Sequence, residues 1–289
     1  MGTLAADLGL APVTTPQRVV KVFFAIPTMG YTDPLAYDNR LLWSMRMGVT
    51  GERARWVHRL LTTDMPDLLR TALLAGEEIG AVETYGIRYE MYLGTVGKLL
   101  TPYAREVLAE KAVQAGMDLV FMVDDDMLGD PDVFFQLAAN VVDGPADICG
   151  ALAFTRNPPH DPVLYTCLDG RDPIDGAYFV NTIVKRYPKD ALVEVDAVGF
   201  GAVVFRTALL AKMKRPWFMS TCGSGEDIFF CYKAKRDAGA RIFSDTRVKL
   251  GHVGNAMIVT EETYETCTGV GAERARDGDD VKYPWAVMR

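Results

Sequence analysis

Asp118-Leu119-Val120-Phe121-Met122-Val123-Asp124-Asp125-Asp126 is the stretch from which the fold can be predicted. Its five consecutive apolar residues predict a strand that is buried on both faces, as in a parallel sheet. Three carboxylates follow the strand, and Asp130 and Pro131 then predict the start of a helix. The acids are therefore expected at the carboxyl end of a central strand, where open α/β sheets bind their ligands.

Three adjacent carboxylates repel one another, so a positive group is expected among them. A divalent cation that carries a phosphate would suit oxygen ligands of this kind. The alternative interpretation is a solvated turn whose acids cap the next helix.

Composition narrows the class of protein. A chain of 289 residues allows one large α/β domain or two small ones. The formal charge of -7 argues against a broad nucleic-acid-binding face. The five cysteines show no CxxC spacing, which favours a reducing compartment. Residues 1–17 lack a signal-peptide pattern, and no apolar run approaches the ~18 residues of a transmembrane helix, so a cytoplasmic protein is expected.

The remaining chain predicts alternating strands and helices. Strands are expected at 18–27, 85–93, 147–154, 194–206 and 241–245, and helices at 35–47, 52–61, 66–75, 101–116, 132–142, 207–214, 226–238 and 261–267. The first strand ends in Pro27, Thr28 and Gly30. In a doubly wound sheet this loop contacts the nucleotide, although a plain tight turn explains the pattern equally well.

Arg105 lies near the start of the predicted helix 101–116. A guanidinium there could reach the ligand crevice and bind a pyrophosphate or a base. In that case Arg105→Ala would weaken nucleotide binding with little loss of stability. The alternative is a solvated arginine that pairs weakly with Glu106 or Glu110, neither of which has the favoured helical spacing.

Further candidates follow in the second half. Asp196, Gly199 and Gly201 interrupt an apolar stretch; the glycines indicate close backbone approach, and Asp196 could bind a sugar hydroxyl. A bulge with a solvent-facing acid is the alternative. Glu226 and Asp227 begin a helix after a glycine loop, a position that the helix dipole alone also favours.

His252 follows an apolar stretch at a predicted strand end. A metal ligand could be placed there, although an isolated histidine is more often structural.

The order of these features resembles the GT-A fold glycosyltransferases, close to family 2. The resemblance covers about residues 18–256, leaving 1–17 as an N-terminal tail and 257–289 as a C-terminal extension or lid. It implies an α/β protein with a Rossmann-like three-layer α/β/α sandwich and a mostly parallel central sheet.

The resemblance also implies roles for individual residues. Asp124, Asp125 and Asp126 match the DXD motif, which binds the ribose and the metal that holds the donor diphosphate. Asp124, Asp126 and His252 would then ligate Mn2+ or Mg2+, with Asp124 or Asp125 at the ribose. Glu226 and Asp227 match the acceptor-side acids, and Asp227 would be the catalytic base. The N-terminal half departs from the family pattern, because no acid there is a firm match for the one that reads the nucleobase.

The function predicted from this resemblance is metal-dependent transfer of a sugar from a nucleotide diphosphate sugar, with UDP favoured, to a hydroxyl. The acceptor could be a small molecule, a protein, a lipid head group or a modified DNA base. Inversion at the anomeric carbon is expected, and a retaining enzyme is an alternative. A nucleotidyltransferase that makes nucleotide sugars and a non-catalytic binding module are two competing interpretations; the nucleotidyltransferase is disfavoured because Pro27–Gly30 contains no Arg or Lys.

Overall fold

The computed structural model describes residues 18–28, 43, 46, 78–84, 86–97, 99–169, 179–221, 224–253, 258–268 and 287–288. The predicted positions Gly30 and Tyr85, the tail 1–17, and the predicted helices 35–47, 52–61 and 66–75 lie outside these ranges, apart from Trp43 and Arg46, which are helical.

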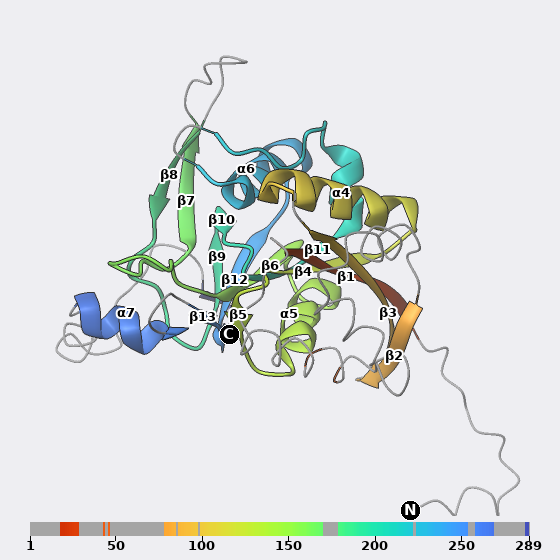
Figure 1. The fold of residues 1–289 in the computed structure, drawn as a ribbon, viewed down its shortest axis with the longest axis horizontal. Coiled ribbons are helices and arrows are strands. Elements are labelled where there is room, and N and C mark those ends of the chain that lie inside the picture. Colours follow the sequence, from red (N-terminus) through yellow and green to blue (C-terminus); the bar gives the residue numbers. More distant parts are fainter. Residues whose placement is uncertain are drawn as a thin grey trace, which may run out of the picture.

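A nine-stranded sheet forms the centre of the molecule (Figure 1). Its order is β15 (Val287–Met288), β9 (Leu192–Val195), β12 (Ile242–Lys249), β6 (Ile148–Leu152), β11 (Ala202–Arg206), β4 (Leu119–Val123), β1 (Arg18–Thr28), β3 (Ile87–Gly97) and β2 (Glu78–Thr84). β1, β3, β4, β6, β12 and β15 run in one direction, whereas β2, β9 and β11 run in the other. The predicted mostly parallel sheet is confirmed, with antiparallel strands inserted.

Helices cover both faces of this sheet (Figure 1). On one face lie α4 (Thr101–Gln114), α6 (Glu226–Ala238) and the 3-10 helix η2 (Thr207–Lys212); on the other lies α5 (Val133–Val142). Every residue of β4 is buried; Val120 and Met122 pack towards α4, and Leu119 and Phe121 pack towards α5. This alternation confirms the predicted strand buried on both faces and the three-layer α/β/α architecture.

Two small sheets lie beside the central one. β10 (Ala197–Val198), β7 (Leu164–Asp169) and β8 (Phe179–Ile183) form the first. β14 (Ile258–Val259), β13 (Gly251–Val253) and β5 (Met127–Leu128) form the second. β5 begins immediately after the acidic triplet, and α5 starts at Val133 with Asp132, rather than Asp130, at its N-cap.

The C-terminal part packs against this framework. α7 (Glu261–Thr268) places Tyr264 fully inside, with its ring stacked 5.4 Å from that of Phe154, and β15 extends the sheet beside β9. Among the described helices, none combines the length and apolar character that crossing a membrane requires.

The predicted strand 194–206 is wrong as a single element. The structure divides it into β9, β10 and β11, which belong to two different sheets. The breaks fall at Asp196 and at residues 199–201, where two glycines flank the buried Phe200.

Gly94 of β3 lies against side chains of β1 and α4. A Cβ at this position would lie 2.2 Å from Cζ of Phe23 and 3.2 Å from Cδ2 of Leu108. Gly94→Ala is therefore expected to lower the free energy of unfolding by about 1–3 kcal/mol through overpacking. Urea denaturation measures this loss, with Val19→Ala on the exposed side of β1 as the control; an unchanged midpoint for Gly94→Ala would contradict the packing.

Candidate active site

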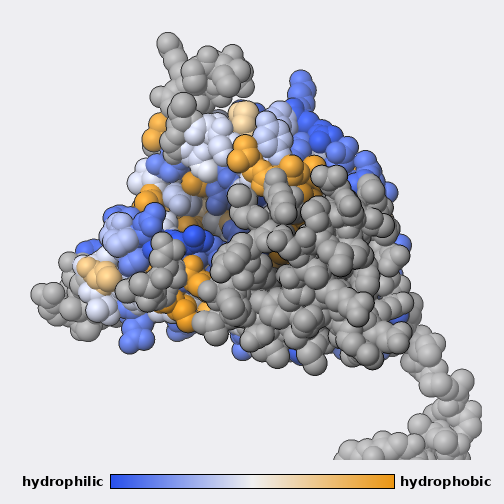
Figure 2. All heavy atoms as spheres, in the orientation of Figure 1, coloured by the Kyte–Doolittle hydropathy of each residue, from blue (hydrophilic) through white to orange (hydrophobic). Residues whose placement is uncertain are grey.

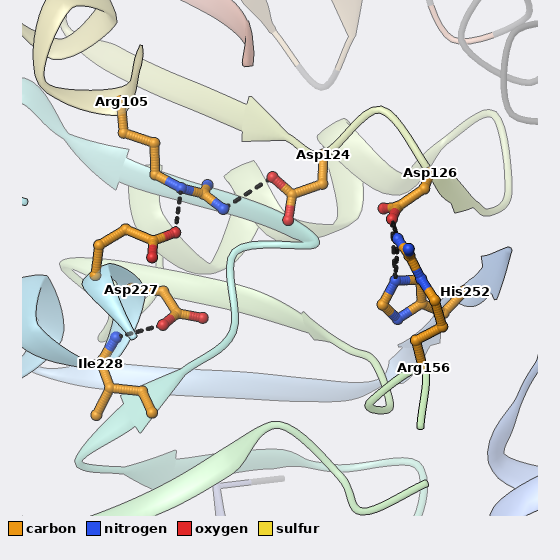
Figure 3. Close-up of polar contacts among 8 residues, drawn as sticks. Arg105, Asp124, Asp126, Arg156, Asp227, Ile228 and His252 are labelled. Atoms are coloured by element: carbon orange, nitrogen blue, oxygen red, sulfur yellow. Dashed lines mark hydrogen bonds and ion pairs between the residues drawn. The ribbon is translucent and has the colours of Figure 1, made fainter. Parts of the chain in front are cut away.

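The carboxyl ends of β1, β4, β6 and β12 meet at one edge of the sheet, and the chemically distinctive side chains gather there. Asp124 follows β4, and its backbone N–H donates to the carbonyl of Gly201, 3.1 Å away, just before β11. The first residues of α4 and α6 reach the same edge and supply Arg105, Glu226 and Asp227. Two clusters result (Figure 3).

The first, the Arg105 cluster, comprises Arg105, Asp124, Glu226 and Asp227. Nη2 of Arg105 donates to Oδ1 of Asp124 at 2.8 Å, and Nε donates to Oε1 of Glu226 at 3.0 Å. The arginine side chain is only 3% exposed, and its guanidinium lies 5.1 Å from the ring centre of Phe200. The alternative of a solvated Arg105 is wrong, and Glu106 and Glu110 pair with Arg215 instead.

Burial and charge shift the pKa values in this cluster. Burial raises the pKa of Asp124 to about 6, against the opposing charge of Arg105. Burial and the charge of Glu226 raise the pKa of Asp227. Burial alone would lower the pKa of Arg105, but the neighbouring carboxylates raise it, so this arginine stays charged. The cluster therefore holds carboxylates that accept a proton more readily than an exposed aspartate does.

The second, the Arg156 cluster, comprises Asp126, Arg156 and His252. His252 enters through β13, which pairs with β5 so that His252 lies opposite Met127. Nε2 of His252 lies 3.1 Å from Oδ2 of Asp126, and Nη2 of Arg156 contacts the same oxygen and lies 3.4 Å from Nε2 (Figure 3). Nδ1 of His252 lies 2.8 Å from the carbonyl of Phe154, which favours the tautomer protonated at Nδ1, and the Nε2 lone pair then accepts from Nη2 of Arg156. Burial lowers the pKa of His252, which favours this neutral form.

The two clusters together contain seven residues. The sequence predicts six of them as site residues, and the structure adds the seventh, Arg156; the six are Asp124, Asp126, Arg105, Glu226, Asp227 and His252. The signal for Arg156 was its place in the loop after β6, at the same carboxyl edge as the acidic triplet. Burial, followed by the charge of Asp227, raises the pKa of Tyr165 in β7, a residue that the sequence patterns did not indicate.

Three other predicted site residues, Pro27, Thr28 and Asp196, belong to neither cluster. Pro27 and Thr28 end β1, where they pair with Val96 and Gly97. Asp196 accepts a hydrogen bond from the backbone N–H of Cys167 at 2.8 Å and also pairs with Lys235 of α6.

The selected glycines allow close packing. A Cβ on Gly199 would lie 2.6 Å from Cγ2 of Val163, and one on Gly201 would lie 3.1 Å from Sδ of Met127. Both positions therefore show close packing against protein side chains.

Exposed apolar side chains lie at the start of α4, the helix that carries Arg105. Leu99, Leu100 and Tyr103, at the start of α4, are exposed within two turns of Arg105. Figure 2 shows hydrophobic atoms at this end of α4, next to hydrophilic surface.

A separate cavity of about 490 Å3 lies at the opposite edge of the sheet, beside Arg18, Asp118 and Arg206. It contains none of the residues selected from the sequence. The chemistry of the two clusters, rather than the size of this cavity, identifies the candidate active site.

Comparisons with known proteins agree with the fold. The sequence matches no protein-family model and no curated protein sequence. Among solved structures, A197 from STIV is similar over 84% of this chain and 92% of its own, with 15% identity and a TM-score of 0.50. A UDP-glucose pyrophosphorylase complexed with UDP-glucose is similar over 89% of this chain and 99% of its own, with 10% identity and a TM-score of 0.45.

GalNAc-T7 with UDP, GalNAc and Mn2+ is similar over 88% of this chain and 48% of its own, with 11% identity and a TM-score of 0.39. At these identities the likeness concerns the fold alone. The likeness to A197 from STIV agrees with the overall fold, the two structures with TM-scores below 0.5 add no argument, and membership of glycosyltransferase family 2 stays a prediction.

Proposed function

We propose that the protein is a metal-dependent glycosyltransferase that moves a sugar from a nucleoside diphosphate sugar to an acceptor hydroxyl. The observation that carries this proposal is the convergence of the two clusters at one edge of the sheet. One cluster offers proton-accepting carboxylates beside a buried arginine. The other offers a carboxylate and a neutral imidazole in contact. Proton removal from a hydroxyl and binding of a diphosphate need these two kinds of group.

Asp227 is the better candidate for the base. Oε1 of Glu226 accepts from Nε of Arg105 at 3.0 Å, which holds this side chain against the arginine. Oδ1 of Asp227 accepts from the backbone N–H of Ile228 at 2.8 Å, so Oδ2 is the oxygen left to receive the acceptor proton. The raised pKa of Asp227 brings its basicity closer to that required near neutral pH.

Asp126 and His252 fit a divalent cation. In an octahedral site with ligands at about 2.1 Å, neighbouring ligand atoms lie about 3.0 Å apart. Oδ2 of Asp126 and Nε2 of His252 are 3.1 Å apart. The hydrogen bond from Nδ1 to a backbone carbonyl is the usual support of a metal-binding histidine. Within the described ranges no third His, Cys, Asp or Glu joins them, so the donor phosphates would complete the shell.

The contributions can be divided between ion and protein. A bound Mn2+ or Mg2+ would neutralise the charge that develops on the diphosphate leaving group. Asp126 and His252 would hold that ion, Asp227 would remove the proton from the acceptor hydroxyl, and Arg105 would keep Asp124 and Glu226 in place. Asp124 and Asp125 stay proposed ribose contacts, and Pro27, Thr28, Gly30, Asp196, Gly199 and Gly201 stay proposed as contacts of the donor.

A product assay tests the function directly. The protein is incubated with a panel of UDP- and other nucleoside diphosphate sugars, and release of the nucleoside diphosphate is measured with and without hydroxyl acceptors. Release supports a sugar transferase, since water can serve as a slow acceptor. Release of pyrophosphate from a nucleoside triphosphate and a sugar phosphate, without turnover of the diphosphate sugars, would instead identify a nucleotidyltransferase.

Chelation tests the metal. In excess chelator, transfer should fall about 10²-fold or more, because several kcal/mol of charge stabilisation are lost. Adding Mn2+ should restore it. Asp126→Ala and His252→Ala should show the same loss at limiting Mn2+. Asp143→Ala, an exposed aspartate that pairs with Arg18 at the opposite edge, is the control. Full activity in chelator would refute the metal requirement.

A further inference from the structure

We infer that Arg156 is an exchangeable internal cation, which competes with a divalent metal for Asp126 and His252 and binds donor phosphate once the metal displaces it. This inference rests on the proposed function and assigns a role to a residue outside the predicted motifs. It starts from the need, visible in the sequence, for positive charge among Asp124, Asp125 and Asp126. The structure meets that need with two arginines, Arg105 and Arg156.

The two arginines are held very differently. Arg105 is 3% exposed, bridges two carboxylates and lies over the ring of Phe200. Arg156 is 45% exposed and stands in a loop that contains Asn157 and two prolines. Its side-chain contacts are with Asp126 and His252. A buried, doubly paired guanidinium is a permanent part of the fold, whereas a half-exposed pair contributes little stability and exchanges readily.

Arg156 and a metal ion would use the same electron pairs. The guanidinium N–H groups point to Oδ2 of Asp126 and to Nε2 of His252, the two atoms whose 3.1 Å separation suits neighbouring ligands of one ion. Because Nδ1 of His252 faces the carbonyl of Phe154 as a donor, the lone pair on Nε2 is the one that this imidazole can offer. Each occupant therefore excludes the other, and two positive charges this close would repel.

The released guanidinium would remain at the edge where the proposed diphosphate binds. The loop after β6 starts beside β12, and β13, which carries His252, follows β12 directly. A planar guanidinium with five donors suits phosphate oxygens better than a point charge does. Metal binding and phosphate binding should consequently reinforce each other, since the ion frees the arginine that the phosphate needs.

Mn2+ binding to the full chain, measured by electron paramagnetic resonance without nucleotide, tests the competition. Arg156→Ala should bind free Mn2+ about three- to tenfold more tightly than the natural protein, the effect expected when a competing conformation of this stability is removed. Arg241→Ala is the matched control, because Arg241 is 43% exposed and pairs with Glu194 at the amino end of β12. Asp126→Ala should bind Mn2+ more weakly in both the natural and the Arg156→Ala backgrounds.

Binding of inorganic pyrophosphate tests whether the released Arg156 binds phosphate. In saturating Mn2+, Arg156→Ala should bind pyrophosphate about tenfold more weakly, as loss of one charge-assisted contact implies, and Arg156→Lys should recover part of the affinity. Unchanged or weaker Mn2+ binding by Arg156→Ala would overturn the competition, and unchanged pyrophosphate affinity would overturn the phosphate role. If neither the natural protein nor Arg156→Ala binds Mn2+, Arg156 is a fixed counter-ion and the inference fails. The product assay in chelator still decides separately whether the protein is a transferase.

Discussion

Asp227→Asn is expected to reduce turnover by about 10²-fold or more while leaving the affinity for UDP nearly unchanged. The amide keeps the shape of the side chain and its hydrogen bond from Ile228, but it cannot accept the acceptor proton at neutral pH. Steady-state kinetics and calorimetric titration with UDP measure the two quantities.

The raised pKa of Asp227 adds a pH signature. Activity should fall as the pH falls through this raised value, because the protonated acid is no base, and the acid limb should therefore lie above that of an ordinary aspartate. The charged form is also disfavoured in the folded state relative to the unfolded state. That destabilisation is present above the folded-state pKa and vanishes below the unfolded one, so Asp227→Asn should not lower stability at neutral pH.

Asp237→Asn on the same helix is the matched control. Burial would raise the pKa of Asp237, but the hydrogen bonds and positive charges of Arg236 and Lys233 outweigh burial and lower it. Its ionised form therefore stabilises the fold above its unfolded-state pKa, and that contribution is lost as the pH falls through the folded-state value. Asp237→Asn should thus lose some stability and keep full turnover, the reverse of Asp227→Asn. An α-linked product from an α-linked donor would mean retention and would remove the assigned role of Asp227.

Arg105→Met is expected to destabilise the protein by about 3–5 kcal/mol, the usual cost of removing one partner from a buried ion pair. The change leaves the carboxylates of Asp124 and Glu226 without their shared cation in a site that is largely closed to water. The sequence alone predicted little loss of stability for an alanine at this position. That expectation changes because the side chain is buried. Urea denaturation measures the loss.

A double-mutant cycle separates charge from packing at Arg105. Arg105→Met combined with Glu226→Gln should recover part of the lost stability, because one uncompensated charge is removed. Arg215→Met is the control, since Arg215 is 48% exposed and its pairs with Glu106 and Glu110 should contribute no more than about 1 kcal/mol. Equal losses for the buried and the exposed arginine would contradict the structural role assigned to Arg105.

The elements with strong local signals were predicted correctly from the sequence. β4 is one, because five apolar residues bounded by acids leave few alternatives. α6 is another: it runs from Glu226 to Ala238, as predicted, and ends at Gly239, whose φ of 65° is the left-handed conformation that glycine adopts at helix ends. In such elements the local residue pattern and the tertiary structure agree.

The errors have a common physical cause, which is pairing between distant strands. The apolar run around Asp196 looked continuous, yet its parts pair with β12, β7 and β4 in different sheets. The sequence does not predict Arg156 as a site residue, because its approach to His252 depends on β6 lying beside β12. Asp196 finds Lys235, 39 residues away, in the same manner. Strand order of this kind depends on the whole chain and leaves no local mark.

The same strand order has a consequence for how the chain reaches its native state. β4 and β6 are joined only through β11, and β9 finds its partners in β12 and β15, which are synthesised after it. Contacts of such large sequence separation slow folding, because loop closure must precede the stabilising pairings. We expect β9 to stay unpaired on the ribosome until β12 has emerged, and to be the strand most open to aggregation during synthesis.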